Sequence, residues 1–219
     1  MAVVSQPNDR DGKVSAPGKL DPSLGEFWVE RPWEIFKKGH NLSSYERKRF
    51  YLNVPGGVRG RDFFDLSFLS GADNDGDGRS VVAADFRNTG QLDLVVRQAG
   101  GGPILVYENQ LPPRHYLKVS LRGTKSNRLG VGARLTATAR GRSQVREQYP
   151  LNSYRSQMPS LVHFGLGDAD RVERLVIRWP SGLEQELTDL PADRHVVVTE
   201  GKAGAEAVEA VVPGRTVRP

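Results

Sequence analysis

The chain has 219 residues, enough for one large domain or two small ones. Its 24 glycines and 14 prolines imply many turns, and the absence of cysteine excludes disulfide bridges and thiolate metal sites. The net charge is +5, but basic and acidic residues are interleaved and no nucleic-acid-binding motif accompanies them, which argues against nucleic acid as a partner. No apolar run approaches the length of a membrane span.

The first residues predict an arm without a fixed fold. Residues 1–25 are polar and rich in Pro, Gly, Asp and Ser, a composition typical of disorder. They contain no apolar core of a secretory signal, which predicts a chain that stays inside the cell. A fragment of a longer exported protein, or a gene model that begins late, is the alternative. Residues 26–36 form the first apolar segment, and we expect Trp28 and Trp33 to pack in a core or lid rather than to form a binding platform.

The next part of the chain predicts short strands joined by tight turns. Runs of β-branched, aromatic and aliphatic residues separated by Gly and Pro are typical of strands. They indicate strands at residues 50–52, 62–69, 81–82, 92–96 and 104–107. Pro112 and Pro113 form a stiff boundary, at which we place the domain junction.

An acidic loop lies between the second and third of these strands. Asp73, Asp75 and Asp77 alternate and a glycine follows them. Oxygen ligands from alternate residues converge on one point, which is what calcium requires, so these three aspartates are the predicted metal site. Val81 and Ala84 occupy the positions of the ninth and twelfth ligands. A solvated acidic turn is therefore the alternative.

A second loop repeats this pattern more weakly. Asp85, Gly90 and Asp93 are kept, whereas Arg87 and Thr89 stand where the middle acids belong. A guanidinium beside two carboxylates substitutes for a bound ion by pairing with them. We therefore expect a metal-free turn in which Arg87 pairs with Asp85 and Asp93, and bound calcium is the alternative.

Together, these strands and acidic turns resemble the FG-GAP/VCBS repeat. Residues 26–111 hold one or two blades' worth of this pattern. The resemblance implies a partial β-propeller-like region whose loops bind calcium.

The second half predicts a series of short strands with glycine turns between them. Alternating apolar and polar residues indicate strands at residues 116–121, 131–139, 144–149, 161–166, 172–179, 184–187 and 195–199. Such regular spacing is typical of an antiparallel β-sandwich, which we place at residues 112–200. For residues 201–219 we expect a flexible tail, with a short helix at 203–211 as the alternative.

Several ordered motifs in this half resemble the ASPIC/UnbV domain. They are Arg122-Gly123-Thr124, Ser126-Asn127-Arg128, Gly130, Gly132-Ala133-Arg134, His163-Phe164-Gly165-Leu166-Gly167 and Arg178-Trp179-Pro180-Ser181-Gly182. In that family the domain follows FG-GAP/VCBS repeats, as in cartilage acidic protein and many exported bacterial proteins. The resemblance implies a secreted or periplasmic interaction module and carries over no catalytic residue or cofactor.

Individual polar residues of this half have structural explanations beside functional ones. His163 lies within a predicted strand, where we expect a hydrogen-bonded core group. Arg134 and Arg178 are expected to form surface ion pairs, with an anionic ligand as the alternative. Asn127 and Arg128 lie on a glycine-rich loop. Loops carry function more often than strands do, but turn geometry alone explains the glycines and the asparagine here.

The chain contains none of the linear catalytic motifs for serine hydrolases, zinc proteases or nucleotide hydrolysis. Its four histidines, His40, His115, His163 and His195, are scattered, although a Ser-His-Asp triad assembled in space stays open. We therefore predict a non-catalytic binding module for a protein or carbohydrate partner. The alternatives are an enzyme with a site between the two halves and a structural piece that completes a propeller in a partner chain. The sequence does not predict the oligomeric state.

Overall fold

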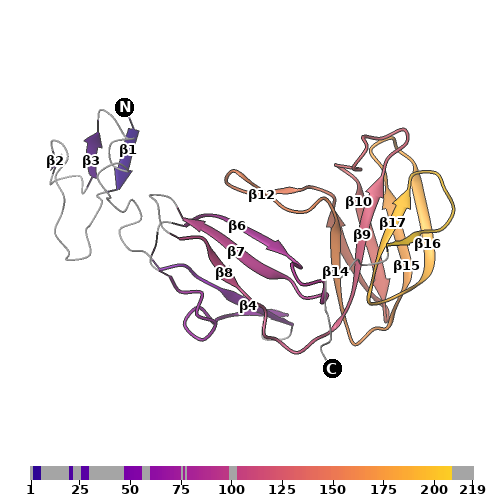
Figure 1. Cartoon of the computed structure of the whole chain (residues 1–219), viewed down its shortest axis with the longest axis horizontal. Helices are drawn as coiled ribbons and strands as arrows, with labels where there is room; N and C mark the ends of the chain where they lie inside the picture. The colour runs from indigo at the N-terminus through magenta and orange to yellow at the C-terminus, as the bar shows by residue number, and fades with distance from the viewer. Residues whose placement is uncertain are drawn as a thin grey trace, which may run out of the picture. The chain divides into compact units, whose positions relative to one another are not determined.

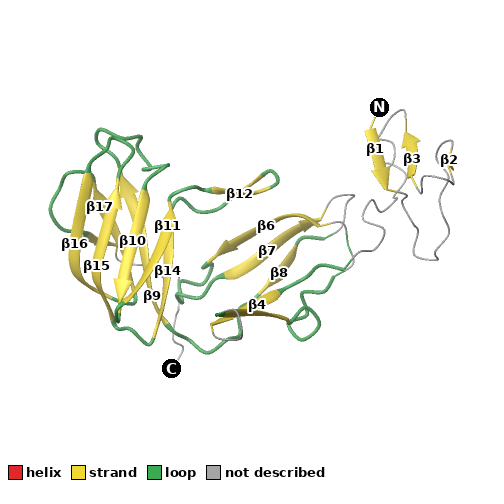
Figure 2. Ribbon diagram, turned by 180° about the vertical axis from the view of Figure 1, so that it is seen from behind, coloured by secondary structure: helices red, strands yellow, loops and turns green. Residues whose placement is uncertain are grey.

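The computed structural model describes residues 2–5, 20–21, 26–29, 47–55, 60–74, 76, 78–98 and 103–208 (Figure 1). These residues form strands and turns with no helix among them, which confirms the all-β prediction (Figure 2). In this part of the chain no helix is long and apolar enough to cross a membrane. The chain divides into two compact units, residues 1–81 with 95–107 and residues 82–94 with 108–219.

The first half forms small sheets. A three-stranded sheet has the order β1-β3-β2, and β4 pairs with β5 in an antiparallel hairpin. A second three-stranded sheet has the order β6-β7-β8. The strands are β1 (Ala2–Ser5), β2 (Leu20–Asp21), β3 (Glu26–Val29), β4 (Tyr51–Pro55), β5 (Arg61–Asp65), β6 (Gly78–Ala84), β7 (Asp93–Gln98) and β8 (Leu105–Tyr107).

Strand β5 is shorter than the sequence predicts. It ends at Asp65 instead of Leu69. The Asp65 carboxylate accepts a hydrogen bond from the Ser67 backbone N–H at 2.9 Å, and it also accepts one from the Ser67 hydroxyl. An aspartate that bonds the backbone two residues on favours a turn over a continued strand.

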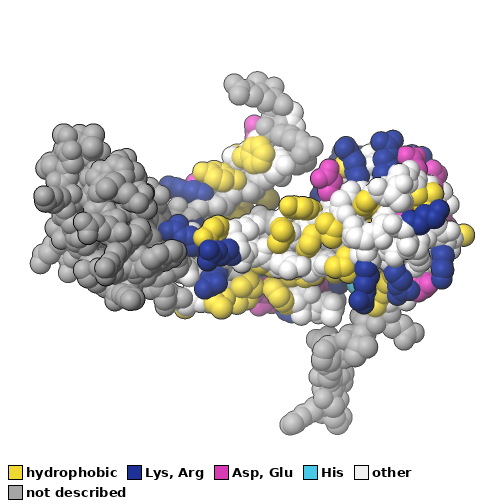
Figure 3. All heavy atoms as spheres, turned by 90° about the horizontal axis from the view of Figure 1, so that it is seen from above, with side chains coloured by type: hydrophobic (Ala, Val, Ile, Leu, Met, Phe, Trp, Pro, Cys, Tyr) yellow, Lys and Arg dark blue, Asp and Glu magenta, His cyan; other side chains and the backbone are white. Residues whose placement is uncertain are grey.

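Apolar side chains of this hairpin and the turn after it face solvent. Phe63 and Phe64 of β5 are 64% and 53% exposed, and Phe68 and Leu69 of the turn are 82% and 81% exposed. Hydrophobic side chains are conspicuous over the part of the chain that holds β4 to β8, whereas charges of both signs mix over the four-stranded sheets (Figure 3). Among the described residues, the hydrophobic core cluster contains no residue of β4 or β5.

The second half builds two four-stranded sheets, β11-β10-β15-β16 and β14-β9-β17-β18, and a β12-β13 hairpin. Its strands are β9 (His115–Arg122), β10 (Arg134–Ala139), β11 (Arg142–Glu147), β12 (Leu151–Ser153), β13 (Ser156–Gln157), β14 (Val162–Gly167), β15 (Arg171–Arg178), β16 (Glu184–Pro191), β17 (Arg194–Thr199) and β18 (Glu206–Val208).

Alternation along these strands places apolar side chains in one core. Leu117, Phe164, Leu135, Ile177 and Val198 come from both sheets and are fully buried in a single hydrophobic cluster. Successive residues of a strand point to opposite faces, so each strand contributes every second side chain. The polar residues between them face away from this core.

Three details of the second half differ from the sequence prediction. Strand β17 runs parallel to β9, so the sheets are not wholly antiparallel. The parallel pair arises because the chain crosses to the other sheet between β16 and β17. Strand β10 begins at Arg134 instead of Val131, after Gly130 and Gly132, whose positive φ angles of 62° and 93° are incompatible with a strand. Residues 206–208, expected in a loose tail or short helix, form β18 against β17.

Candidate functional site

The outer face of β9 carries an unusual buried charge. Leu117, Val119 and Leu121 point into the core, so Tyr116, Lys118 and Ser120 lie on the opposite face of the sheet. Lys118 is nevertheless only 6% exposed. Lysine is almost never buried without a partner. The partner is supplied by the turn between β6 and β7.

Lys118 binds this turn through its ammonium group. Its Nζ donates to Oδ2 of Asp85 at 2.8 Å and to Oδ1 of Asn88 at 3.3 Å. The Asp85 carboxylate also accepts the backbone N–H groups of Thr89 at 2.9 Å and Gly90 at 2.7 Å. Burial alone would raise the pKa of Asp85, but the hydrogen bonds from Lys118 and the two backbone groups outweigh burial and lower the pKa. The Asp85 carboxylate is therefore charged and accepts hydrogen bonds from all three of these groups.

Gly90 closes the other side of the turn against the sheet. Its carbonyl oxygen lies 2.8 Å from Nε2 of His163, and a carbonyl only accepts, so Nε2 carries the hydrogen. Gly90 has a φ of 84°, and a Cβ built there would lie 1.9 Å from Cδ1 of Tyr116. Glycine is required for both its conformation and the close approach of the ring.

His163 bonds as predicted, but it does not lie in the core. It faces the turn, and its ring stacks on Tyr116 with centroids 6.0 Å apart. Burial lowers the pKa of His163 despite the hydrogen bond to Gly90 and the nearby charge of Asp85. The imidazole is therefore neutral near pH 7.

The expected role of Arg87 is only half right. Arg87 pairs with Asp93, with Nη2 of the guanidinium 3.1 Å from Oδ1, and it also pairs with Glu108. It does not pair with Asp85, which Lys118 holds instead. Arg87 contacts only one of the two aspartates because their carboxylates point in different directions. The Asp85 carboxylate points at the sheet, whereas the Asp93 carboxylate points at residues after β8 such as Asn109.

A pocket of about 360 Å³ lies beside the buried ion pair and is lined in part by Asp85, Lys118, His163 and His195. Nε2 of His195 lies 2.8 Å from Oγ of Ser120 on the neighbouring strand. Burial and the charge of Lys118 lower the pKa of His195. A catalytic serine–histidine pair also needs a carboxylate that orients the second ring nitrogen. Among the residues that the structure describes, no carboxylate forms a hydrogen bond with His195.

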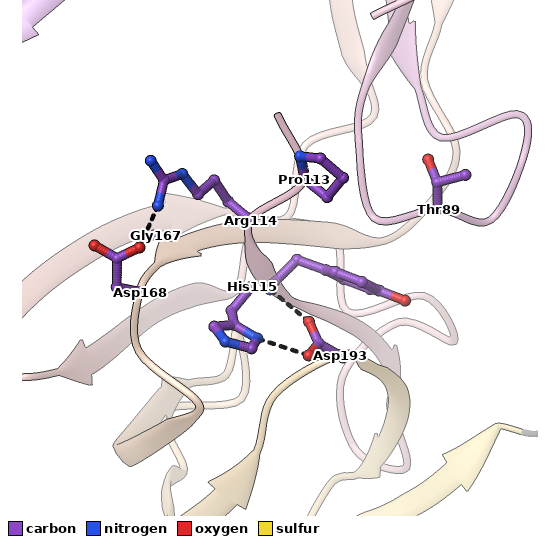
Figure 4. Close-up of a pocket in the computed structure, with 8 residues that line it drawn as sticks. Thr89, Pro113, Arg114, His115, Gly167, Asp168 and Asp193 are labelled. Atoms are coloured by element: carbon purple, nitrogen blue, oxygen red, sulfur yellow. Dashed lines mark hydrogen bonds and ion pairs between the residues drawn. The ribbon is translucent and has the colours of Figure 1, made fainter. Parts of the chain in front are cut away.

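Figure 4 shows a second pocket, of about 430 Å³, beside the start of β9. Nδ1 of His115 lies 2.7 Å from Oδ2 of Asp193, and Arg114 pairs with Asp168. Asp193 has a φ of 57°, and its backbone N–H donates to the Tyr116 carbonyl at 2.8 Å. Its side-chain Oδ1 accepts the Tyr116 backbone N–H at 3.3 Å. The polar groups of this pocket thus engage one another, and Asp193 fixes the first residues of β9.

A second buried charge organises the loop after β9. Oε2 of Glu200 accepts the backbone N–H groups of Thr124, Lys125 and Ser126 at 2.7, 2.7 and 2.8 Å. Oε1 accepts the hydroxyls of Ser126 at 2.8 Å and Ser181 at 2.5 Å. Burial would raise the pKa of Glu200, but the hydrogen bonds from Ser126, Ser181 and Thr124 outweigh it and hold the pKa far below its ordinary value. Residues 124–126 and Ser181, which belong to separate sequence motifs, therefore all bind the carboxylate of Glu200.

Part of the chain matches a known protein family. Residues 123–205 match the family model described as ASPIC and UnbV. The matched range begins at the loop that Glu200 holds and ends just before β18. A search of curated proteins found no match.

Other predicted site residues of the ASPIC and UnbV region have structural roles. Arg178 forms the expected surface ion pair, with Nε 2.8 Å from Oε2 of Glu184. Arg134 is exposed and stands opposite Arg178 on the neighbouring strand. Asn127 closes its own loop, because its side chain bonds both the N–H and the carbonyl of Val131. Sequence reasoning missed Lys118 and Glu200, since neither belongs to a local motif.

The predicted calcium site lies only partly within the described residues. Asp73 forms an ion pair with Arg47, whereas Asp75 and Asp77 lie outside the described residues. Within the part of the chain that the structure describes, no three His, Asp or Glu side chains are grouped to hold a metal ion. Calcium binding by this loop stays a prediction.

The Glu200 cluster predicts a pH-dependent loss of stability. Because the folded state lowers the pKa of Glu200, its contribution is complete above the unfolded pKa of about 4.3 and is lost as the pH falls below it. We expect Glu200→Gln to lower the free energy of unfolding at pH 7, and the difference from wild type to shrink toward pH 3. Urea unfolding at several pH values measures this. Glu206→Gln, which removes one member of an exposed ion pair with Arg122, is the control. A difference that stays constant down to pH 3 contradicts the assignment.

The buried ion pair predicts strong coupling between Lys118 and Asp85. We expect Lys118→Met to cost about 3–5 kcal/mol, because it leaves a buried carboxylate without its counter-ion. In the double variant with Asp85→Asn, the cost should fall below the sum of the single variants by at least about 1 kcal/mol. Chemical unfolding of all four proteins measures the coupling. Arg171→Met at the exposed pair with Asp189 should change stability by less than about 0.5 kcal/mol.

The close approach of the Tyr116 ring to Gly90 predicts a cost of substituting Gly90, and Gly141 is the matched control position. Both have positive φ angles, 84° and 71°, but a Cβ at Gly141 meets nothing within 4 Å. Alanine at either position therefore adds backbone strain of about 1 kcal/mol, and only Gly90→Ala adds the clash with the ring. We expect the melting temperature to fall clearly further for Gly90→Ala. Equal losses would show that Tyr116 moves aside without cost.

Proposed function

We propose that this protein is a non-catalytic interaction module that recognises a β-turn of a protein chain. The observation that carries the proposal is the contact between the outer face of β9 and the turn that holds Asp85 and Gly90. Here the recognised turn comes from the same chain. A partner with the same kind of turn, such as another repeat-bearing protein, would offer the same groups.

The chemistry of this face favours a protein over a carbohydrate. Lys118 binds a side-chain carboxylate and His163 binds a backbone carbonyl. Tyr116 lies where only a residue without Cβ fits. These three requirements together describe a polypeptide turn with an aspartate and a glycine. Hydroxyls of a neutral sugar accept hydrogen bonds from Lys118 and His163, but they supply no negative charge to neutralise the buried ammonium.

We further infer that the two four-stranded sheets pack face to face as a β-sandwich. The support is the single hydrophobic cluster to which both contribute. We assign the strands and acidic turns between residues 47 and 98 to an FG-GAP/VCBS-like repeat region, on the pattern of their sequence. In this interpretation the sandwich is the rigid receptor and the turn is its ligand. Secretion or export to the periplasm follows from the family resemblance alone.

The proposal predicts binding of the turn when it is supplied separately. In a full-length Asp85→Lys variant, repulsion from Lys118 should release the chain's own turn from the face. A peptide of residues 82–94 with the natural sequence, closed at its ends to pre-organise the turn, should then bind this variant. Isothermal titration calorimetry measures the affinity. We expect the peptide to bind at least about tenfold more weakly when its own Asp85 is replaced by Asn, a loss of about 1.4 kcal/mol.

Two controls make this test specific. Wild-type protein should bind the peptide poorly, because its own turn competes at high effective concentration. The Asp85→Lys variant that also carries Lys118→Met should lose the preference for the natural peptide over the Asn peptide. Equal binding of both peptides to every variant would refute recognition by this face.

A further inference from the structure

Gly165 is a glycine within β14 for which the chain itself gives no reason. Its φ is not positive, so its backbone conformation is open to any residue. A Cβ built at Gly165 meets nothing within 4 Å, so no neighbouring atom excludes a side chain. The strand pairing is irregular between Gly165 and Gly167, but Gly167 is the residue with the positive φ, of 63°. The irregularity therefore accounts for Gly167 and not for Gly165.

Gly165 lines a further pocket, of about 580 Å³, that has an apolar wall. The wall consists of Leu92, Leu111 and Pro112. Asn109 holds two of these residues in place, because its Nδ2 donates to the Leu92 carbonyl at 3.2 Å and its Oδ1 accepts the Leu111 backbone N–H at 3.0 Å. A glycine inside a strand weakens the strand and often marks a place where a ligand approaches the backbone. Gly165 thus leaves a pre-formed pocket open where a side chain would enter it.

Arg146 brings a positive charge to this pocket. It lies on the same side of β11 as Gln144, whose Nε2 donates to the Gly165 carbonyl at 2.7 Å. The Arg146 guanidinium donates to the Val145 carbonyl at 2.9 Å and to Oε1 of Gln144 at 3.4 Å. Neither acceptor is charged, and within the described part of the chain Arg146 forms no ion pair. A guanidinium has more N–H donors than these two acceptors use.

The other basic side chains of the pocket already have partners. Arg114 and His115 each bond an aspartate, and His163 bonds a backbone carbonyl. No acidic residue is among those that line the pocket. A ligand with a single negative charge therefore gains a counter-ion in Arg146, whereas a cation gains none.

We propose that this pocket binds a small organic acid, in which a carboxylate is joined to a short apolar body. A carboxylate accepts the paired N–H groups of a guanidinium and carries one charge, whereas a phosphate carries about two near neutral pH. The apolar body lies against Leu92 and Leu111, in the space that the missing side chain of Gly165 leaves. A volume of about 580 Å³ is within the range of small-molecule sites.

Hexanoate is the probe for this proposal, and nitrogen-15 NMR of the backbone amides of the full chain reports where it binds. We expect saturable shifts of the Gly165 and Leu111 signals. Hexanol, which lacks the charge, and acetate, which lacks the apolar body, should each bind at least about fivefold more weakly. The proposal is overturned if hexanol binds as well as hexanoate, if hexyl phosphate binds more tightly, or if hexanoate gives no saturable shift up to about 50 mM.

Variants of the two key residues assign the binding to this pocket. Gly165→Val should abolish the hexanoate-dependent shift at Leu111. Gly165→Ala should melt no lower than the wild type, because the strand has room for the added Cβ. Arg146→Met should reduce hexanoate affinity to that of hexanol, whereas Arg142→Met, on the same side of β11 but outside the pocket, should leave it unchanged.

Arg146 also lines the pocket beside the buried ion pair, whereas Gly165 and Leu111 line only the pocket proposed here. Hexanoate binding that survives Gly165→Val would therefore place the ligand elsewhere. A clear loss of stability in Gly165→Ala would show that the glycine is structural. Either result overturns the proposal. The wild-type chain keeps its own turn in place throughout, so the outcome is independent of the peptide experiment above.

Discussion

The ammonium of Lys118 lies on a sheet face from which water is largely excluded, and the arrangement of the turn depends on how this charge is neutralised. Transfer of an unpaired charge from water to such a place costs several kcal/mol. Asp85 supplies the opposite charge, and Asn88 supplies a further acceptor. The carboxylate in turn draws two backbone N–H groups toward itself. The conformation of the turn is thus imposed by the need to satisfy one buried ion pair.

Glu200 applies the same principle with backbone groups in place of a counter-ion. Three successive N–H groups and two hydroxyls surround its carboxylate. Successive N–H groups that converge in this way form an anion-binding nest. The loop after β9 and the turn before β16 meet at this side chain, which explains why residues far apart in the family motifs form one local structure.

The sequence predicted the strands of the second half well, because alternation of apolar and polar residues reports directly which side of a sheet is buried. It also identified the Arg87–Asp93 pair, whose members are 6 residues apart. It did not predict the Lys118–Asp85 pair, which joins residues 33 positions apart, or the bonds of Glu200 to Ser126, 74 positions away. Local sequence patterns carry no information about which distant residue pairs with a buried charged side chain.

The parallel pairing of β9 with β17 was missed for a related reason. Both strands have the alternation of half-buried strands, and alternation is the same for either direction of the neighbour. The direction is decided by where the chain crosses between sheets, at the turn that contains Asp193. The positive φ of Asp193 and its bonds to His115 and Tyr116 mark that crossing. These features become visible only in three dimensions.

The exposed rings of Phe63, Phe64 and Phe68 have a consequence for handling the protein. Each ring keeps more than half of its surface in water, and unpaired strand edges next to apolar side chains favour contacts between chains at high concentration. Yield during expression and solubility during purification will therefore be governed by this hairpin rather than by the well-packed second half. Replacing solvent-facing phenylalanines by polar residues is the natural first step toward a preparation suited to crystallisation.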